Sequence, residues 1–229
     1  MSRSTGATRE PILLSWSGGK DSSLALAALR DDPSVEIVGL ITSVTRGYER
    51  ISIHGVRRTL LDAQVRQIGL PLYEITLEPS SSNEAYEAAV AATLAEVRRR
   101  EPAVRRIAYG DLFLADVRRY REVQLAGFGF TGLFPLWGQD TRALARDFID
   151  RGFEARLVCV DTSQLDARFS GRLYDHALLD ELPATVDPCG ERGEFHTFVS
   201  AGPCFQSRVG YEVGEVVLRD ERFAYCELR

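Results

Sequence analysis

The sequence contains almost no lysine. Lys20 is the single lysine, the other 27 of the 28 basic residues are arginine, and the 229-residue chain carries a net charge of −5. Proteins that hold long nucleic acid normally present a stripe of clustered positive charge, which an acidic chain of this composition does not favour. We therefore expect no long nucleic acid partner, while a local basic patch stays compatible with the composition.

Long apolar runs are also missing. No stretch approaches the roughly 20 consecutive apolar residues that a helix needs to span a bilayer. The opening segment, 1–10, lacks the apolar centre of a signal peptide. We therefore expect no membrane partner, a cytoplasmic location and a flexible tail at 1–10.

Cysteine is scarce as well. The four cysteines, Cys159, Cys189, Cys204 and Cys226, are widely spaced and include no C-x-x-C pair. That spacing excludes a zinc ribbon and a dithiol redox motif, so we expect reduced thiols. The sequence is nevertheless apolar enough, at 45% hydrophobic residues, to bury the core of one large or two small domains.

Strand-like and helix-like segments alternate through the first half of the chain. Short apolar runs with β-branched residues predict strands at 12–15, 35–43, 72–77 and 106–109. Helical spacing of apolar residues predicts helices at 22–30 and 56–68, and Ser81 and Glu84 resemble a capping box that opens a third helix ending near Arg100. Alternation of this kind is typical of βαβ units and a parallel sheet.

The pattern changes after about Phe134. We expect a helix at 141–151, a strand at 155–160, and β-structure from Phe195 onward with turns at Gly202-Pro203 and Arg219-Asp220-Glu221. The sequence therefore predicts an α/β fold, with a parallel-sheet domain at 11–133 and a smaller α+β domain at 134–229.

The lone lysine lies in a glycine loop between the first predicted strand and helix, Ser17-Gly18-Gly19-Lys20-Asp21-Ser22-Ser23. Amides at a helix N-terminus can receive phosphate oxygens, and glycine lets the chain approach closely. The serines add hydroxyl donors, Lys20 adds a compact charge, and Asp21 offers a carboxylate to Mg²⁺. The loop is not a Walker A motif, because Leu14 stands where that motif has its first glycine.

This loop resembles the PP-loop of ATP pyrophosphatases, which holds the departing pyrophosphate while AMP passes to a substrate oxygen. The resemblance implies ATP and Mg²⁺ as cofactors, catalytic roles for Lys20 and Asp21, a metal-ligand role for Asp21, and cofactor contacts from Ser17, Gly18, Gly19, Ser22 and Ser23. The competing interpretation is an ordinary Gly-Gly turn between a strand and a helix.

Three further segments resemble the diphthine–ammonia ligase family, and with the loop they cover nearly the whole chain. They are Gly110-Asp111 with Arg118 and Glu122, Phe134-Pro135-Leu136-Trp137-Gly138, and Asp187-Pro188-Cys189-Gly190-Glu191-Arg192-Gly193-Glu194-Phe195. The resemblance implies a nucleotide-binding first domain of the adenine nucleotide alpha hydrolase (HUP) type and a second domain that forms the other wall of a substrate cleft. The implied reaction adenylates a carboxylate and then lets ammonia displace AMP to give an amide.

The same resemblance implies the ligand contacts. Gly110 and Asp111 are expected at the cofactor, and the substrate is expected at His54, Arg57, Arg118, Glu122, Cys189, Gly190, Glu191, Gly193, Glu194 and His196. Simpler interpretations stay open for several of these: a surface His54, a solvated helix start at Arg57, a helix N-cap at Asp111, an Arg118–Glu122 ion pair and a packed Cys189 thiol. A metal site at Cys189 and His196 is not expected, because no second Cys or His lies nearby.

Residues between Gly110 and Glu122 depart from the family pattern, at Leu114, Asp116, Val117 and Tyr120, and so do two residues in the last matching segment. Arg192 and His196 stand where the family commonly has a glycine and a carboxylate, which makes this segment less acidic. Diphthine carries a fixed positive charge, so the ATP chemistry carries over better than the substrate does. We expect a small-molecule or protein-borne carboxylate, with ammonium as the second substrate.

Two other functions are compatible with the loop. One is tRNA modification by a PP-loop ATP pyrophosphatase, which would depend on Cys189 or on tRNA binding. The other is a sensor that binds ATP without turning it over, although such a module needs only the first domain. The sequence also leaves open whether the chain forms a homodimer.

Overall fold

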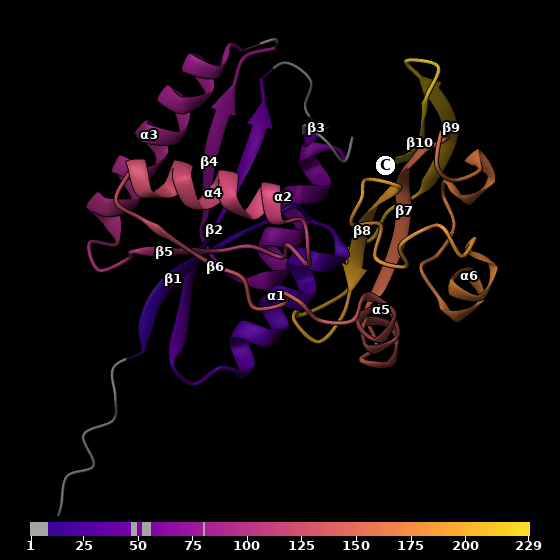
Figure 1. Ribbon diagram of the computed structural model, residues 1–229, viewed down its shortest axis with the longest axis horizontal. Coiled ribbons are helices and arrows are strands. Elements are labelled where there is room, and N and C mark those ends of the chain that lie inside the picture. The colour runs from indigo at the N-terminus through magenta and orange to yellow at the C-terminus, as the bar shows by residue number, and fades with distance from the viewer. Residues whose placement is uncertain (1–8, 47–49, 52–55, 80) are drawn as a thin grey trace, which may run out of the picture.

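The computed structural model describes residues 9–46, 50–51, 56–79 and 81–229, which form two lobes side by side (Figure 1). The first lobe is built on a mainly parallel sheet, and the second on an antiparallel sheet. Within the described ranges, no helix combines the length and the apolarity that crossing a bilayer requires.

The first sheet contains five parallel strands in the order β4-β2-β1-β5-β6. Their bounds are β1 (Glu10–Ser15), β2 (Val35–Thr45), β4 (Leu72–Leu77), β5 (Arg106–Ala108) and β6 (Thr131–Leu133). The short β3 (Arg50–Ile51) pairs antiparallel with the end of β2. The helices between these strands are α1 (Lys20–Asp31), α2 (Arg58–Ile68), α3 (Asn83–Arg100) and α4 (Ala115–Gly127).

Side chains of the first sheet alternate between two helical layers, as successive residues of a strand must. Leu13 of β1 faces a core with Leu94 of α3 and Leu125 of α4. Its neighbours Ile12 and Leu14 face the opposite core, which holds the apolar side chains of α1 and α2. The sheet is therefore covered on both faces, which explains its nearly continuous apolar strands.

The second lobe packs onto the α1 and α2 layer. Its antiparallel strands follow the order β8-β7-β10-β9, with β7 (Glu154–Asp161), β8 (Phe195–Ala201), β9 (Val213–Arg219) and β10 (Phe223–Leu228). Two α-helices, α5 (Thr141–Asp150) and α6 (His176–Glu181), and a 3-10 turn at Ala167–Phe169 complete it. Phe148 and Phe198 belong to the same apolar cluster as Leu24 and Leu61 of the first lobe, so the lobes share one core.

The predicted α/β class and the order of its elements are confirmed. The strand at Leu72–Leu77 matches its predicted bounds, and the third helix ends at Arg100 as predicted. The helix start was wrong by one residue, because the Ser82 hydroxyl, not that of Ser81, accepts the Ala85 amide at 3.3 Å. The short β6 and α6 were not predicted, since neither is long enough to show a clear hydrophobic period.

Candidate functional site

The glycine loop follows the strand at which the order of the first sheet reverses. From β1 the chain continues to β2 on one side, while β5 pairs with the other side of β1. In open parallel sheets, ligands bind outside the carboxyl ends of the strands at such a switch point. The loop after Ser15 and the segment after Ala108 meet at this place.

Internal hydrogen bonds hold the loop closed. Gly18 has a φ of +77°, a conformation that favours glycine. The hydroxyls of Ser22 and Ser23 both donate to the carbonyl oxygen of Gly19, at 2.9 and 3.0 Å, and Ser17 accepts the Gly19 amide at 3.3 Å. The hydroxyl groups of Ser22 and Ser23 therefore stabilise the conformation of the loop by donating hydrogen bonds within it.

The second lobe clamps the same loop. The backbone amide of Lys20 donates to the Thr197 hydroxyl at 3.0 Å, and the Val199 amide donates to the Gly18 carbonyl at 3.0 Å. Gln64 of α2 also donates to the Gly18 carbonyl. Loop, helix α2 and strand β8 thus meet at one hydrogen-bonded junction. Sequence reasoning missed Gln64 and Thr197.

The sequence contains a pattern that could have identified Gln64 as a buried residue. Leu60, Leu61, Gln64 and Ile68 are the buried residues of α2, at the spacing of one helical face. A glutamine within that apolar stripe must find hydrogen-bond partners when it is buried, and it does so here.

Lys20 and Asp21 form the charged centre of the site. The Lys20 ammonium is 2% exposed and lies 2.7 and 2.8 Å from the two carboxylate oxygens of Asp21. Burial opposes its charge, but nearby groups, chiefly the Asp21 carboxylate, together outweigh that effect and raise the pKa of Lys20. The Phe195 ring, centred 5.8 Å from the ammonium, completes its surroundings. Lys20 therefore stays positively charged at neutral pH.

A cavity of about 230 Å³, here called the loop cavity, opens beside this pair. Its lining comes from the loop, the segment after β5 with helix α4, and the chain before and at the start of β8: Gly19, Lys20, Asp21, Asp111, Leu114, Val117, Arg121, Gly190, Glu191, Gly193, Phe195, His196 and Thr197. The structure thus brings predicted residues from both domains to one cavity. Gly110 lies just behind it, where an added Cβ would come within 2.7 Å of the Asp21 carbonyl.

The two predicted glutamates of the 187–195 segment differ in position. Glu191 lines the loop cavity and accepts the Leu112 amide at 2.8 Å, which ties this segment to the chain after β5. Burial raises the pKa of Glu191. Glu194 is fully buried, and its oxygens accept the amides of Asp187 and Arg192, both at 2.9 Å. Glu194 therefore shapes its own loop and does not line the cavity.

Asp111 pairs with Arg121, a residue that sequence reasoning missed. The guanidinium donates to both carboxylate oxygens, at 2.6 and 3.1 Å, and stacks 4.4 Å from the centre of the Tyr109 ring. Leu114, not Asp111, is the N-cap of α4. Arg121 follows Leu114 and Val117 at helical spacing, which is the signal that could have placed it on the cavity-facing side.

Arg118 and Glu122 lie on another face of α4. They pair with each other at 2.8 Å, and Arg118 stacks on Phe134 and Trp137, with 4.7 Å to each ring centre. Neither residue is in the lining of the loop cavity. The structure therefore has the simple ion pair that the spacing also allowed.

The remaining predicted residues differ in their positions, and only some of them line the loop cavity. Arg57 faces Glu227 at 3.6 Å, and His54 lies outside the described residues. Cys189 is buried, donates to the Thr141 carbonyl, and has its pKa raised to about 12 by burial, which favours the packed-thiol interpretation. His196 lines the loop cavity, and burial lowers its pKa to about 4, so its ring is neutral at pH 7.

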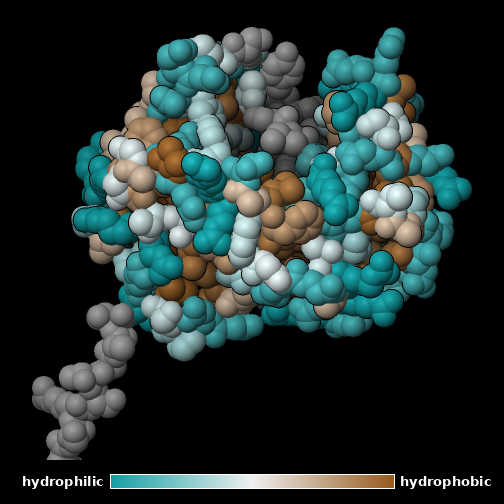
Figure 2. Space-filling model, in the orientation of Figure 1, coloured by the Kyte–Doolittle hydropathy of each residue, from teal (hydrophilic) through white to brown (hydrophobic). Residues whose placement is uncertain are grey.

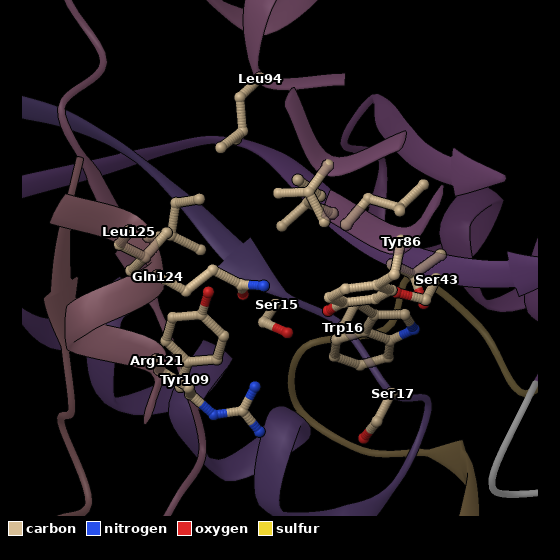
Figure 3. A pocket seen from close by; sticks show the side chains of 15 residues that line it. Ser15, Trp16, Ser17, Ser43, Tyr86, Leu94, Tyr109, Arg121, Gln124 and Leu125 are labelled. Atoms are coloured by element: carbon tan, nitrogen blue, oxygen red, sulfur yellow. The ribbon is translucent and has the colours of Figure 1, made fainter. Parts of the chain in front are cut away.

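A second cavity of about 180 Å³, the aromatic cavity, adjoins the first (Figure 3). It is lined by Ser15, Trp16, Ser17, Ile41, Thr42, Ser43, Ile75, Tyr86, Val90, Leu94, Ile107, Tyr109, Arg121, Gln124 and Leu125. Figure 3 shows the rings of Trp16 and Tyr86 on one side, and Tyr109 with Arg121 on the other. Arg121 lines both cavities, so together they could hold a planar aromatic group joined to a charged one.

The site could hold a metal ion only if substrate phosphates supplied some of its ligands. In the part of the chain that the structure describes, no group of three or more His, Cys, Asp or Glu side chains could hold a metal ion by itself. Asp21 lines the loop cavity with 32% of its side chain exposed. Mg²⁺ is often bound by one or two carboxylates together with substrate phosphates, an arrangement that Asp21 fits.

Known proteins resemble the chain over nearly its full length. Residues 11–124 match the diphthamide synthase N-terminal domain, and residues 140–227 match the diphthamide synthase C-terminal domain. A diphthine–ammonia ligase of Danio rerio is 29% identical over 181 residues, covering 72% of this chain and 70% of that protein. The Homo sapiens diphthine–ammonia ligase is 27% identical, covering 88% of this chain and 83% of that protein.

A solved structure of a tRNA thiolase from Methanococcus maripaludis, with its iron–sulfur cluster, is 18% identical. The match covers 65% of this chain and 59% of that one, with a TM-score of 0.37. A similarity at this level does not indicate a shared site or function.

Proposed function

Since the chain belongs to the diphthamide synthase family, we propose that it is an ATP-dependent ligase that forms an amide from a carboxylate and ammonia. The resemblance expected from the sequence is thereby confirmed at the level of the family.

The observation that carries this proposal is the junction of the two cavities at Arg121. The aromatic cavity has a lining that suits a nucleobase, because the rings of Trp16, Tyr86 and Tyr109 line it beside polar groups. The loop cavity is lined by the Lys20 ammonium and the Arg121 guanidinium, two positive groups that phosphate oxygens could contact, together with the carboxylates of Asp21, Asp111 and Glu191. ATP bound across both would place its α-phosphate near the Arg121 guanidinium.

The proposed chemistry has two steps. A carboxylate oxygen of the substrate attacks the α-phosphorus, the bond to the β-phosphate breaks, and pyrophosphate leaves. Ammonia then attacks the acyl carbon, AMP leaves with the bonding electrons, and the nitrogen releases one proton to solvent to give the neutral amide. Lys20 and Arg121 offset the negative charge that builds up on the phosphates in the first step. Mg²⁺, held by Asp21 and the phosphates, would add to that charge compensation.

The second lobe supplies the shield for the acyl adenylate. Gly190, Gly193 and His196 line the same cavity as Asp111 and Arg121, and the Leu112 amide donates to Glu191 and so ties the second lobe to the segment after β5. Figure 2 shows apolar residues gathered where the two lobes meet. Exclusion of water protects a reactive intermediate from hydrolysis.

The test is a product analysis. The protein is incubated with ATP, Mg²⁺, ammonium and a panel of carboxylates, and AMP, pyrophosphate and amide are measured. We expect AMP and pyrophosphate in equal amounts, and only with a carboxylate that is converted to its amide. Formation of ADP and phosphate would overturn the proposal. Tight ATP binding without turnover across the panel would favour the sensor, and sulfur transfer finds no support in the buried thiol of Cys189.

A further inference from the structure

A third cavity, here called the arginine cavity, lies on the second lobe next to the loop cavity. It encloses about 300 Å³ and is lined by Cys159, Asp161, Gln164, Arg192, Gly193, His196, Arg222, Phe223 and Tyr225. Gly193 and His196 also line the loop cavity, so the two share one wall. The arginine cavity therefore adjoins the place where the substrate carboxylate would react.

The one carboxylate in the lining of this cavity is fully engaged. Asp161 is 2% exposed and accepts hydrogen bonds from two nitrogens of the Arg222 guanidinium, at 2.9 and 2.6 Å. It also accepts the Ser163 hydroxyl at 2.7 Å and the Gln164 amide at 2.9 Å. The hydrogen bonds from Arg222 hold the pKa of Asp161 well below its usual range. Asp161 and Arg222 thus neutralise each other.

The other titratable groups of the lining, apart from Arg192, carry no charge at neutral pH. Burial raises the pKa of Cys159 to about 11 and that of Tyr225 to about 12. Burial lowers the pKa of His196 to about 4. None of these three side chains offers a charge to a ligand.

Arg192 supplies the unmatched charge. Its side chain is exposed, and no ion pair joins its guanidinium to a carboxylate among the described residues. Its backbone amide is fixed by Glu194 at 2.9 Å, and its guanidinium lies 5.6 Å from the centre of the Phe113 ring. A positive group is therefore held between the segment after β5 and the arginine cavity.

We propose that the arginine cavity binds a second anionic group of the carboxylate substrate through Arg192. This inference rests on the proposed function and names the substrate class of its site: a dianion whose two acidic groups are separated by a chain. A guanidinium offers a planar pair of donors that matches a carboxylate. A quaternary ammonium at the same place would meet the charge of Arg192 and would find Asp161 already paired.

The experiment uses matched probes. A series of α,ω-dicarboxylates of increasing chain length is compared with analogues in which one carboxylate is replaced by trimethylammonium. Substrate-dependent pyrophosphate release gives kcat and KM for each probe, and isothermal titration of each probe with the nucleotide-loaded protein gives binding without turnover. We expect at least one dicarboxylate to be preferred over its cationic analogue by about 10-fold or more, a typical effect of a charge-assisted hydrogen bond.

Variants locate the effect. Arg192→Gln should raise KM for the dicarboxylate by about 10- to 100-fold with little change in kcat, and Arg192→Glu should shift the preference toward the cationic analogue. Arg208→Gln, an exposed arginine of the same lobe paired with Glu154, should change neither value. Equal binding of both probe types, binding of neither type, or an unchanged preference in the Arg192 variants would overturn the inference. Selective binding without pyrophosphate release would overturn the proposed function and leave the subsite supported.

Discussion

The side-chain amide of Gln64 donates a hydrogen bond to the Gly18 carbonyl oxygen, with 2.9 Å between the two atoms. The same nitrogen lies 2.6 Å from the Val199 carbonyl oxygen, and the Gln64 oxygen accepts the Trp16 indole N–H at 3.2 Å. Gln64 is completely buried, so no water replaces these partners if the amide is removed. It links the glycine loop, the second lobe and the aromatic cavity.

Replacement of this amide should weaken the contacts among the glycine loop, the second lobe and the aromatic cavity. Gln64→Leu keeps most of the volume but removes the acceptor of the buried Trp16 indole N–H and a donor to the Gly18 and Val199 carbonyls, which should reduce the free energy of unfolding by about 2 to 4 kcal/mol and weaken ATP binding. Urea unfolding and titration with ATP measure the two effects. Gln67→Leu on the same helix, where only the exposed Ser207 hydroxyl loses a partner, is the control. Equal losses in both variants would show that the Gln64 junction has no special role.

We expect that even a conservative replacement of Lys20 abolishes most of the activity. Lys20→Ala removes the ammonium beside Asp21 and should lower the rate of pyrophosphate release by about 100- to 1,000-fold. Lys20→Arg should restore little, because a planar guanidinium does not fit the enclosed position of a compact ammonium. Arg100→Ala, at a surface ion pair with Glu96, serves as the control. Near-normal release by Lys20→Arg would contradict this account, provided that circular dichroism shows a native fold.

Arg121 and Arg118 of α4 test which arginine contacts the ligand, because the structure points to Arg121 and the sequence pointed to Arg118. Arg121→Ala should raise KM for ATP by about 10-fold, the size of one lost charged contact, since Arg121 lines both cavities. Arg118→Ala should leave KM within about 2-fold, because its partners Glu122, Phe134 and Trp137 lie outside the loop cavity. Steady-state kinetics at varied ATP give both values. The reverse order would restore Arg118 as the ligand contact.

His196 should make the fold sensitive to mild acid. Burial lowers its pKa from an ordinary 6.5 to about 4 in the folded protein, so the unfolded chain binds the proton first as the pH falls. Stability present above pH 6.5 is therefore lost as the pH falls toward 4. Urea unfolding at about pH 7 and about pH 5 should show a loss about 1 to 2 kcal/mol larger in the native protein than in His196→Gln. Parallel pH profiles of the two proteins would assign the acid sensitivity to other groups.

The sequence alone determined the features that depend on neighbours along the chain. Glycines after a short apolar run placed the loop between a strand and a helix, and apolar periodicity located the strand at Leu72–Leu77. The family strings identified two segments, at 110–122 and at 187–195, that do meet the loop in one cavity. These signals are local, because hydrophobic spacing and turn chemistry act over a few residues.

Only the tertiary structure decided which side chains of those segments face the cavity. Arg121 and not Arg118 points inward because the rotation of α4 is set by its packing on the sheet. Glu191 faces the cavity while Glu194 turns into its own loop. Contacts such as Lys20 with Thr197 join residues 177 positions apart. No local pattern encodes them, since they form only when the two lobes bury one shared core.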